Sequence, residues 1–347
     1  MNTIMIGLDI AKAVFQVHGE ESGKVMLEKR LRRSQVADFF AKLPRSLVGI
    51  EACGSAHYWA RTLRHLGHDV RLIPAAYVKP FVKRNKTDAR DAAAICAALG
   101  RPDMRFVAIK SVEQQAARGV ERARDLLVKQ HTQLMNSVRS QLAEFGIIAP
   151  QGRRGFIELA HLVGAGDSRV PPPLAAALGM LIGHIEQLGK AVAALEKQII
   201  EAARAHPVMR RLTTIPGVGP LTAHAIVTAI GDGKQFASAR DFAAWCGLTR
   251  RVDQSADKRR QRGISRQGEM RLRKLLALGA STVMRHLRSC PRRASLWQHG
   301  ILARRPLKVA VLAQAARNAR IAWAMLQSGE VYRMPALASA AATPLAG

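Results

Sequence analysis

The chain has 347 residues, 48% of them hydrophobic and 5% aromatic, and it carries 54 Lys and Arg against 25 Asp and Glu, a formal net charge of +29. This hydrophobic fraction excludes a disordered chain and is enough for the cores of two or three domains. Positive charge in such excess is typical of proteins that neutralise phosphates, and the few aromatics argue against single-strand stacking as the main contact.

Strand and helix patterns alternate over the first part of the chain. A strand and a hairpin are expected at 3–21 and further strands at 46–54 and 68–75, with helices at 34–43, 56–67 and 86–100. Strands that alternate with helices in this way predict a sheet covered by helices. We therefore expect an α/β domain over residues 1–108.

Two long helical runs follow, at 111–145 and 174–205, with a Gly- and Pro-rich break between them. Their apolar residues recur in steps of three and four, at Val120, Ala123, Leu127, Leu134, Val138 and Leu142 and then at Leu181, Ile185, Leu188, Val192, Leu195, Ile199 and Ala202. This seam predicts a coiled-coil hairpin or a dimer contact over residues 109–208, with ordinary packed helices as the alternative.

The last folded part is expected at 209–328 and is helical with loops. It opens near "TTIPGVGPLTAHAIVTAIG", and from Arg250 to Lys308 it holds 17 Lys or Arg against three acids. That excess predicts the main contact surface for a polyanion. The tail, 329–347, is rich in small residues and is expected to be disordered.

Four carboxylates of the α/β domain form one candidate site. Asp9 lies in the first strand, Glu51 ends a later apolar strand, and Asp88 and Asp91 lie three apart on the helix after the last strand. Residues three apart share a face of a helix, and adjacent carboxylates repel unless a cation lies between them. The set therefore predicts one or two Mg²⁺ ions acting on a phosphodiester. For Asp88 and Asp91 a helix-capping role, with Thr87 as another cap, stays open.

The segment "IPGVGPLTA" has the form of a helix-hairpin-helix turn. Gly217 and Gly219 would let the backbone approach a phosphate, toward which the next helix points its first amides. Such a turn positions DNA without distinguishing its sequence. A plain tight turn between helices is the alternative.

A basic stretch downstream carries two serines, Ser255 and Ser265. A hydroxyl there can attack a phosphodiester where cations stabilise the charge, although a serine among arginines is usually solvated or in contact with phosphate. Ser265 can also cap the helix that follows. The cations expected to contact nucleic acid are Lys258, Arg259, Arg260, Arg262, Arg266 and Arg271.

The four cysteines, Cys53, Cys96, Cys246 and Cys290, are far apart in the sequence, which disfavours zinc binding and disulfides. No apolar run approaches the length of a membrane span, and the N-terminus lacks a basic segment followed by a long apolar run. We expect a cytoplasmic, nucleoid-associated protein with no membrane partner.

Six motifs, taken together and in order, resemble the DEDD transposases of bacterial insertion sequences. They are "GLDIAK", "GIEACGS", "VKPFVKRNKTDARDAAAICAAL", "SVEQQAARGVERARDLLVKQHTQLMNSVRSQLAEFGI", "IPGVGPLTAHAIVTAIGDGKQFASARDFAAWCGLT" and "KRRQRGISRQGEMRLRKLLALGA". The resemblance covers nearly the whole chain apart from the tail and residues 150–206. It implies a RuvC-like N-terminal domain within the RNase H fold and a C-terminal transposase domain.

By this resemblance the family's acidic tetrad falls on Asp9, Glu51, Asp88 and Asp91, and the serine nucleophile of its C-terminal domain falls on Ser255. The family's Ser-Gly-Gly-Lys motif is "SADK" here, so the two glycines are replaced. The resemblance also implies strand exchange through a 5′-phosphoserine, double-stranded DNA at the element ends and the target, and an element-encoded guide (bridge) RNA. It further implies a homo-oligomer, a dimer or tetramer, in which one subunit's tetrad meets another's serine.

Three other functions are weighed against this one. A Mg²⁺-dependent structure-selective nuclease of the Holliday-junction type would use the tetrad and water and would not need Ser255. A sugar-kinase or actin-like ATPase would require Gly-Thr or Gly-Ser after Asp9, which "DIAKAV" lacks. A nucleic-acid-binding protein without catalysis would be unaffected by Asp9→Asn or Asp88→Asn.

Overall fold

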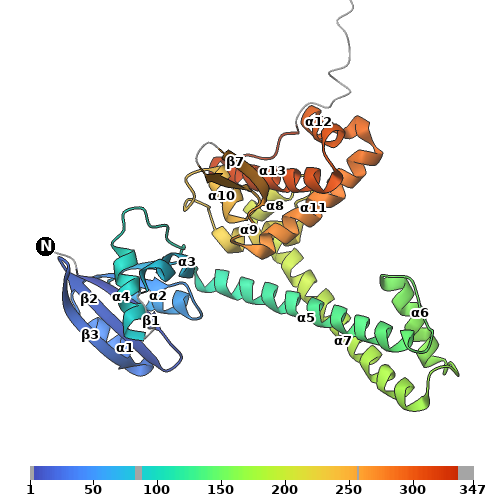
Figure 1. Cartoon of the computed structure of the whole chain (residues 1–347), viewed down its shortest axis with the longest axis horizontal. Coiled ribbons are helices and arrows are strands. Elements are labelled where there is room, and N and C mark those ends of the chain that lie inside the picture. The colour runs from blue at the N-terminus through green and yellow to red at the C-terminus, as the bar shows by residue number, and fades with distance from the viewer. Residues whose placement is uncertain (1–3, 83–87, 256–257, 335–347) are drawn as a thin grey trace, which may run out of the picture. The chain divides into compact units, whose positions relative to one another are not determined.

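The computed structural model describes residues 4–82, 88–255 and 258–334 (Figure 1). The chain forms two compact units, Met1–Glu113 and Gln114–Gly347, and each is considered by itself. Among the described residues, no helix is long and apolar enough to cross a membrane.

A mixed five-stranded sheet forms the first unit. Its strands are β1 (Met5–Ile10), β2 (Val14–Glu21), β3 (Lys24–Arg32), β4 (Leu47–Glu51) and β5 (Asp69–Ile73), in the spatial order β3-β2-β1-β4-β5. β1 pairs antiparallel with β2 and parallel with β4, β2 pairs antiparallel with β3, and β4 pairs parallel with β5. The expected α/β architecture is therefore confirmed, and β3 is a strand that the sequence patterns missed.

Helices cover both faces of this sheet. They are α1 (Val36–Ala41), α2 (Ala56–His65), α3 (Ala75–Val78) and α4 (Asp88–Leu99), with short 3₁₀ turns at Arg33–Gln35 and Lys79–Phe81. Ile6 and Leu8 of β1 pack with Trp59 and Leu63 of α2 in one core. A second core, on the other face of the sheet, contains α4. Because side chains alternate along a strand, successive residues of β1 point toward different cores.

The second unit begins with long helices. α5 (Val112–Ala143) and α7 (Pro172–Ala205) are joined through α6 (Arg153–Gly164), which lies inside the stretch expected to be a break. Arg124 of α5 donates a hydrogen bond of 3.0 Å from its Nε to Glu196 of α7, so these two helices lie side by side there. A core of apolar residues from all three helices includes Val138, Leu159 and Ile185.

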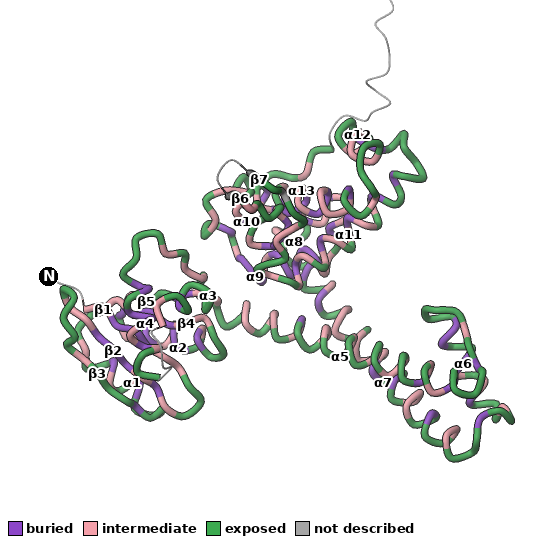
Figure 2. Tube along the Cα trace, in the orientation of Figure 1, coloured by how far each residue is buried: buried purple, intermediate pink, exposed green. Residues whose placement is uncertain are grey.

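The remaining elements are α8 (Pro207–Leu212), α9 (Pro220–Ile230), α10 (Ala239–Trp245), β6 (Arg250–Ser255), β7 (Lys258–Ile264), α11 (Met270–Ser289), a 3₁₀ turn (Pro291–Arg293), α12 (Leu296–Arg304) and α13 (Leu307–Ser328). Residues of α8, α9, α10, α11 and α13 form the largest core, and α12 packs in a smaller one (Figure 2). The helical expectation for this part is confirmed except at β6 and β7, which form an antiparallel hairpin where loops were expected.

Candidate active site

Strand geometry places Asp9 and Glu51 on the same face of the sheet. Leu8 of β1 pairs with Ile50 of the parallel strand β4, so Asp9 and Glu51 are the next residues on the two neighbouring strands. Because Leu8 and Ile50 lie in the core with α2, the residues that follow them point to the opposite face. This is the face that α4 covers.

Glycines let α4 approach this face closely. A Cβ at Gly7 would lie 2.0 Å from the carbonyl oxygen of Ala92, and one at Gly49 would lie 3.2 Å from the Ile95 side chain. The Cys96 thiol of α4 also donates to the Met5 carbonyl oxygen at 3.4 Å. The first turn of α4 is thereby held against the end of β1, where Asp9 lies.

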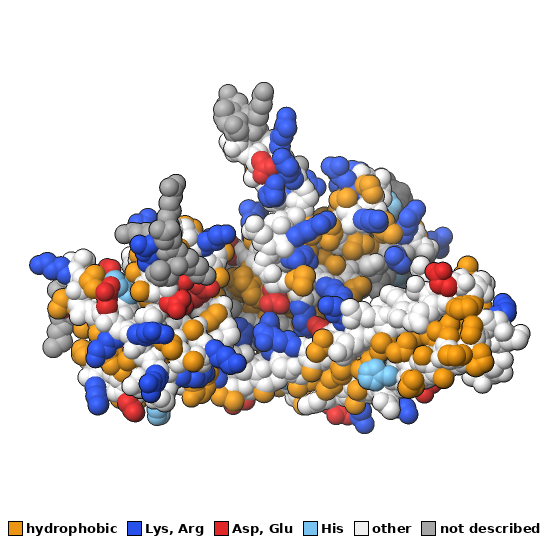
Figure 3. All heavy atoms as spheres, turned by 60° about the horizontal axis from the view of Figure 1, so that its bottom comes forward, with side chains coloured by type: hydrophobic (Ala, Val, Ile, Leu, Met, Phe, Trp, Pro, Cys, Tyr) orange, Lys and Arg blue, Asp and Glu red, His pale blue; other side chains and the backbone are white. Residues whose placement is uncertain are grey.

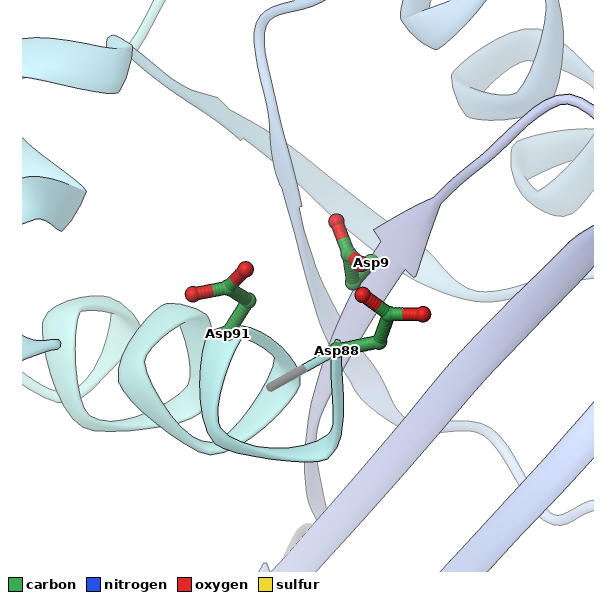
Figure 4. A group of neighbouring side chains, drawn as sticks. All are labelled: Asp9, Asp88 and Asp91. Carbon is green, nitrogen blue, oxygen red and sulfur yellow. The ribbon is translucent and has the colours of Figure 1, made fainter. Parts of the chain in front are cut away.

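The result is a group of three carboxylates, Asp9, Asp88 and Asp91, here named the acid cluster. Each offers one oxygen, and these oxygens all lie within 4.8 Å of one another. Figure 4 shows Asp9 on the arrow of β1 and the two other aspartates on the first turn of α4. Asp9 and Asp91 are half-buried, and Asp88 is exposed, so the cluster is open to solvent on one side.

The electrostatics of the acid cluster favour a cation. Burial, and then the charges of Asp91, Asp88 and Glu51, raise the pKa of Asp9 from 3.8 to about 6. The same surroundings raise the pKa of the Cys53 thiol, through burial first and then through Glu51 and Asp9. Several carboxylate oxygens at one point suit a hard divalent cation, which would relieve this repulsion.

Glu51 lies at the margin of this group. It is half-buried at the end of β4 and its charge acts on Asp9, but it is not among the three residues whose oxygens lie within 4.8 Å. Thr87, the alternative cap of α4, lies outside the described residues. Three of the four predicted carboxylates are thus brought together, and the fourth is a close electrostatic neighbour.

Both candidate serines belong to the second unit. Ser255 is the last residue of β6, and its backbone pairs with Lys258 of β7. The side chains of Ser255, Lys258 and Arg259, and the residues Ala256 and Asp257, lie outside the described part of the chain. Ser265 donates its amide to the Thr249 carbonyl at 2.8 Å. It does not cap α11, because that helix starts at Met270 with Glu269 at its N-cap.

The predicted nucleic-acid contacts differ in what surrounds them. Arg260 and Arg266 are exposed, whereas the Arg262 guanidinium pairs with Asp253 across the hairpin. The Arg271 side chain is 15% exposed and pairs with both Glu121 and Asp125 of α5. Its charge is therefore balanced inside the protein. On the face drawn in Figure 3, Lys and Arg side chains outnumber acidic ones.

The turn between α8 and α9 has a glycine on each side of Val218. Gly217 has a φ of 85°, and its backbone packs on α11, because a Cβ at Gly279 would meet the Gly217 carbonyl oxygen at 1.8 Å. Gly219 caps α9 in an extended conformation, and a Cβ there would meet nothing within 4 Å. Gly217 is thus required by helix packing, and Gly219 faces open space.

A buried charge network in the second unit was not found from the sequence. Glu121, which is 1% exposed, accepts hydrogen bonds from His224 Nδ1 at 2.7 Å and from Thr228 Oγ1 at 3.0 Å. Burial opposes its ionisation, but the bonds from His224 and the charge of Arg271 lower its pKa overall. A lone glutamate in the amphipathic run of α5 gave no signal, since its partners lie more than a hundred residues away.

Comparisons with known proteins agree with this architecture. The DEDD transposase model, described as a transposase, matches residues 6–147, and a model described as the transposase IS116/IS110/IS902 family matches residues 209–297. A probable family 20 transposase of Pseudomonas aeruginosa is 45% identical over 96% of this chain and 99% of its own length. The transposase for insertion sequence element IS1328 of Yersinia enterocolitica is 37% identical over 95% of this chain and 99% of its own. The transposase for insertion sequence element IS1111A of Coxiella burnetii is 38% identical over 95% of this chain and 91% of its own length.

Proposed function

This chain belongs to the IS116/IS110/IS902 family of insertion-sequence transposases, enzymes that act on DNA, and from that premise we propose how its residues cut and rejoin strands. The DEDD model places its N-terminal domain in the RNase H-like class. In the proposal, the acid cluster and Glu51 bind divalent cations, and the Ser255 hydroxyl is the nucleophile. The observation that carries it is the convergence of Asp9, Asp88 and Asp91 from two separate elements.

We assign Mg²⁺ to the cluster, and two observations support a hard divalent cation there: its donors are carboxylate oxygens, and one side is open to solvent and substrate. Bound there, Mg²⁺ would stabilise the negative charge that develops on a phosphodiester during in-line displacement. Asp9, Asp88 and Asp91 are the ligands in this proposal, and Glu51 completes the set from the neighbouring strand. Gly7 acts indirectly, because it allows α4 to bring two of the ligands to the third.

The serine step is a transesterification in this proposal. The bond between Ser255 Oγ and phosphorus forms, and the bond between phosphorus and the 3′ oxygen breaks, which leaves a 5′-phosphoserine and a free 3′ hydroxyl. The hydroxyl proton of Ser255 leaves as that bond forms, and the departing 3′ oxygen takes up a proton. The exposed cations of the β6–β7 hairpin, Arg260 among them, support this assignment because they suit the phosphate charge. Rejoining is the reverse reaction with a different 3′ hydroxyl.

The remaining parts have proposed roles around this chemistry. Residues 109–208 form a coiled-coil spacer, and residues 209–328 form the transposase domain, in which the turn at Gly217 and Gly219 is a helix-hairpin-helix that contacts DNA phosphates. The open space at Gly219 supports that contact, since a Cβ there would meet nothing within 4 Å. A guide RNA encoded by the element selects donor and target DNA, and a homo-oligomer joins the tetrad of one subunit to the serine of another.

The test is a search for a covalent protein–DNA adduct on a denaturing gel. Purified protein is mixed with Mg²⁺, labelled DNA that carries the element junction, and the noncoding end of the element transcribed as RNA. Wild type is expected to form the adduct, Ser255→Ala to lose it, and Ser265→Ala, the matched control, to keep it. Asp9→Asn is expected to lose both cutting and adduct. An adduct that persists in Ser255→Ala contradicts the nucleophile assignment.

One alternative has an observation in its favour. The acid cluster is complete within the first unit, as a Mg²⁺-dependent nuclease that uses water would require. That enzyme would cut equally well with Ser255→Ala and would leave no adduct in either protein. The same gel therefore separates the two functions.

A further inference from the structure

An exposed tryptophan lies on the second unit at the start of α12. Trp297 is 36% exposed, whereas Trp59 of the first unit is 4% exposed and Trp245 and Trp323 pack against the largest core. The Arg317 guanidinium of α13 lies over the Trp297 ring, 4.6 Å from its centroid. An exposed indole held against a guanidinium presents two flat groups to which a nucleobase can stack.

More positive charge surrounds this pair. Arg304 follows Trp297 by seven residues on α12, so both lie on one face of the helix, with Gly300 between them. The Arg304 Nε donates to the Gly300 carbonyl oxygen at 2.9 Å, which turns the guanidinium back toward Trp297. Arg320 follows Arg317 by three residues on α13 and is exposed. Trp297, Arg304, Arg317 and Arg320 are here named the stacking surface.

The whole segment that builds this surface lacks acids. From Met270 to Gly329 the sequence has 12 Lys or Arg and neither Asp nor Glu. Within the described residues, the three arginines of the stacking surface form no ion pair, in contrast to Arg262 and Arg271. A surface with this balance repels basic peptides and attracts a phosphate backbone.

Buried hydrogen bonds hold the surface in place. Ser295 caps α12 with the help of Gln298, whose amide donates to Gln314 at 3.0 Å. Gln314 in turn donates to Asn318 at 2.7 Å, and Asn318 donates to the Pro216 carbonyl oxygen at 2.9 Å. Gln314 and Asn318 are 4% and 1% exposed, so these amides depend on one another for their hydrogen bonds. Trp297 is thereby placed relative to the turn before α9.

We propose that the stacking surface binds an unpaired strand of DNA, with a base stacked on Trp297 and Arg317 and its phosphates near Arg304 and Arg320. A duplex cannot use the indole in this way, because its bases already stack on one another. The occupant is DNA because the family acts on DNA, and cutting and exchanging strands exposes unpaired nucleotides. The proposal needs neither the acid cluster nor Ser255. Strand binding at the stacking surface can therefore fail while the proposed chemistry holds, and the proposed chemistry can fail while strand binding holds.

The test compares four ligands by fluorescence anisotropy, with full-length protein in EDTA so that no divalent cation contributes. They are a thymidine oligomer of about twelve nucleotides, an abasic oligomer of equal length, a matched duplex and a uridine RNA oligomer. Two variants remove the ring: Trp297→Ala, and Trp297→Leu, which keeps an apolar side chain. A third, Trp297→Phe, retains an aromatic ring that can stack. Leu278→Ala removes an apolar side chain of α11 that is 57% exposed, more than Trp297 at 36%, and serves as the control. Thermal unfolding checks that each variant folds.

Loss of the ring is expected to weaken binding of the thymidine oligomer roughly tenfold, in the range measured for one stacked base. Binding of the abasic oligomer and of the duplex should change by less than about twofold, because their phosphate contacts remain. Trp297→Phe should recover most of the loss, and Leu278→Ala should show none. Equal losses for thymidine and abasic oligomers, or no loss for either, would overturn stacking. A loss confined to the RNA oligomer would overturn the assignment to DNA.

Discussion

Replacing Asp9 by asparagine should stabilise the metal-free protein at neutral pH. Its pKa is raised from 3.8 to about 6 by burial and by Asp91, Asp88 and Glu51, so the folded state binds the proton more tightly than the unfolded state does. The favourable contribution of the protonated group is therefore complete below pH 3.8 and is lost as the pH rises through about 6. At neutral pH the ionised carboxylate opposes folding, and asparagine removes that opposition.

The magnitude follows from the shift and from the exposure of the group. A shift of about two pKa units corresponds to about 3 kcal/mol at 1.36 kcal/mol per unit. Because Asp9 is only half-buried and its site is open to solvent on one side, screening reduces this to about 1 to 1.5 kcal/mol. The gain in free energy of unfolding should be present at pH 7.5 and should shrink as the pH falls toward 4.

Urea unfolding in EDTA measures this gain in free energy of unfolding. Hydrogen exchange at the amides of β1 and α4 then assigns the gain to the first unit. Addition of Mg²⁺ should stabilise wild type at pH 7.5 and should stabilise Asp9→Asn much less, because one ligand is lost. An asparagine variant that is no more stable than wild type at pH 7.5, or whose gain is the same at pH 4, would refute the electrostatic reasoning.

Three further predictions concern packing, the buried network and DNA contact. Gly7→Ala places a methyl group 2.0 Å from a backbone oxygen of α4. We expect it to lower the free energy of unfolding in urea by about 1 to 3 kcal/mol and to abolish stabilisation by Mg²⁺. Gly54→Ala, where the added Cβ meets nothing within 4 Å, should do neither. Glu121→Gln should lower the free energy of unfolding of the second unit by about 1 to 3 kcal/mol, since it removes one of the two carboxylates that pair with the buried Arg271. Glu158→Gln, in an exposed pair, should change it by less than about 0.5 kcal/mol. Arg260→Gln should reduce the slope of log K against log salt for duplex binding by about 0.9, and an unchanged slope would show that this arginine touches no phosphate.

The carboxylates of the first unit were predictable because local patterns determine their positions. Asp9 lies in an apolar strand and Glu51 ends another, and an unpaired acid in such a place is costly to bury. β3 was missed because most of Lys24–Arg32 is exposed at the sheet edge and carries charge on both faces. Short-range periodicity is weak in such a strand.

What could not be predicted depends on contacts between distant segments. The sequence around Arg271 is basic, which predicted a phosphate contact, but its partners Glu121 and Asp125 come from another helix. The small number of aromatics likewise gave no indication of which tryptophan would be exposed. Trp297 is distinguished by Arg317 on the next helix, and its importance is visible only once α12 and α13 pack together.

The order in which the cluster residues occur along the chain has a consequence for protein synthesis. Asp9 leaves the ribosome with the first strand, but Asp88 and Asp91 follow only after all five strands of the sheet. A nascent or truncated chain that ends before α4 therefore lacks two of the three residues of the acid cluster and also the helix that packs on that face of the sheet. A premature stop codon upstream of α4 would therefore give a fragment in which the proposed ion site cannot form.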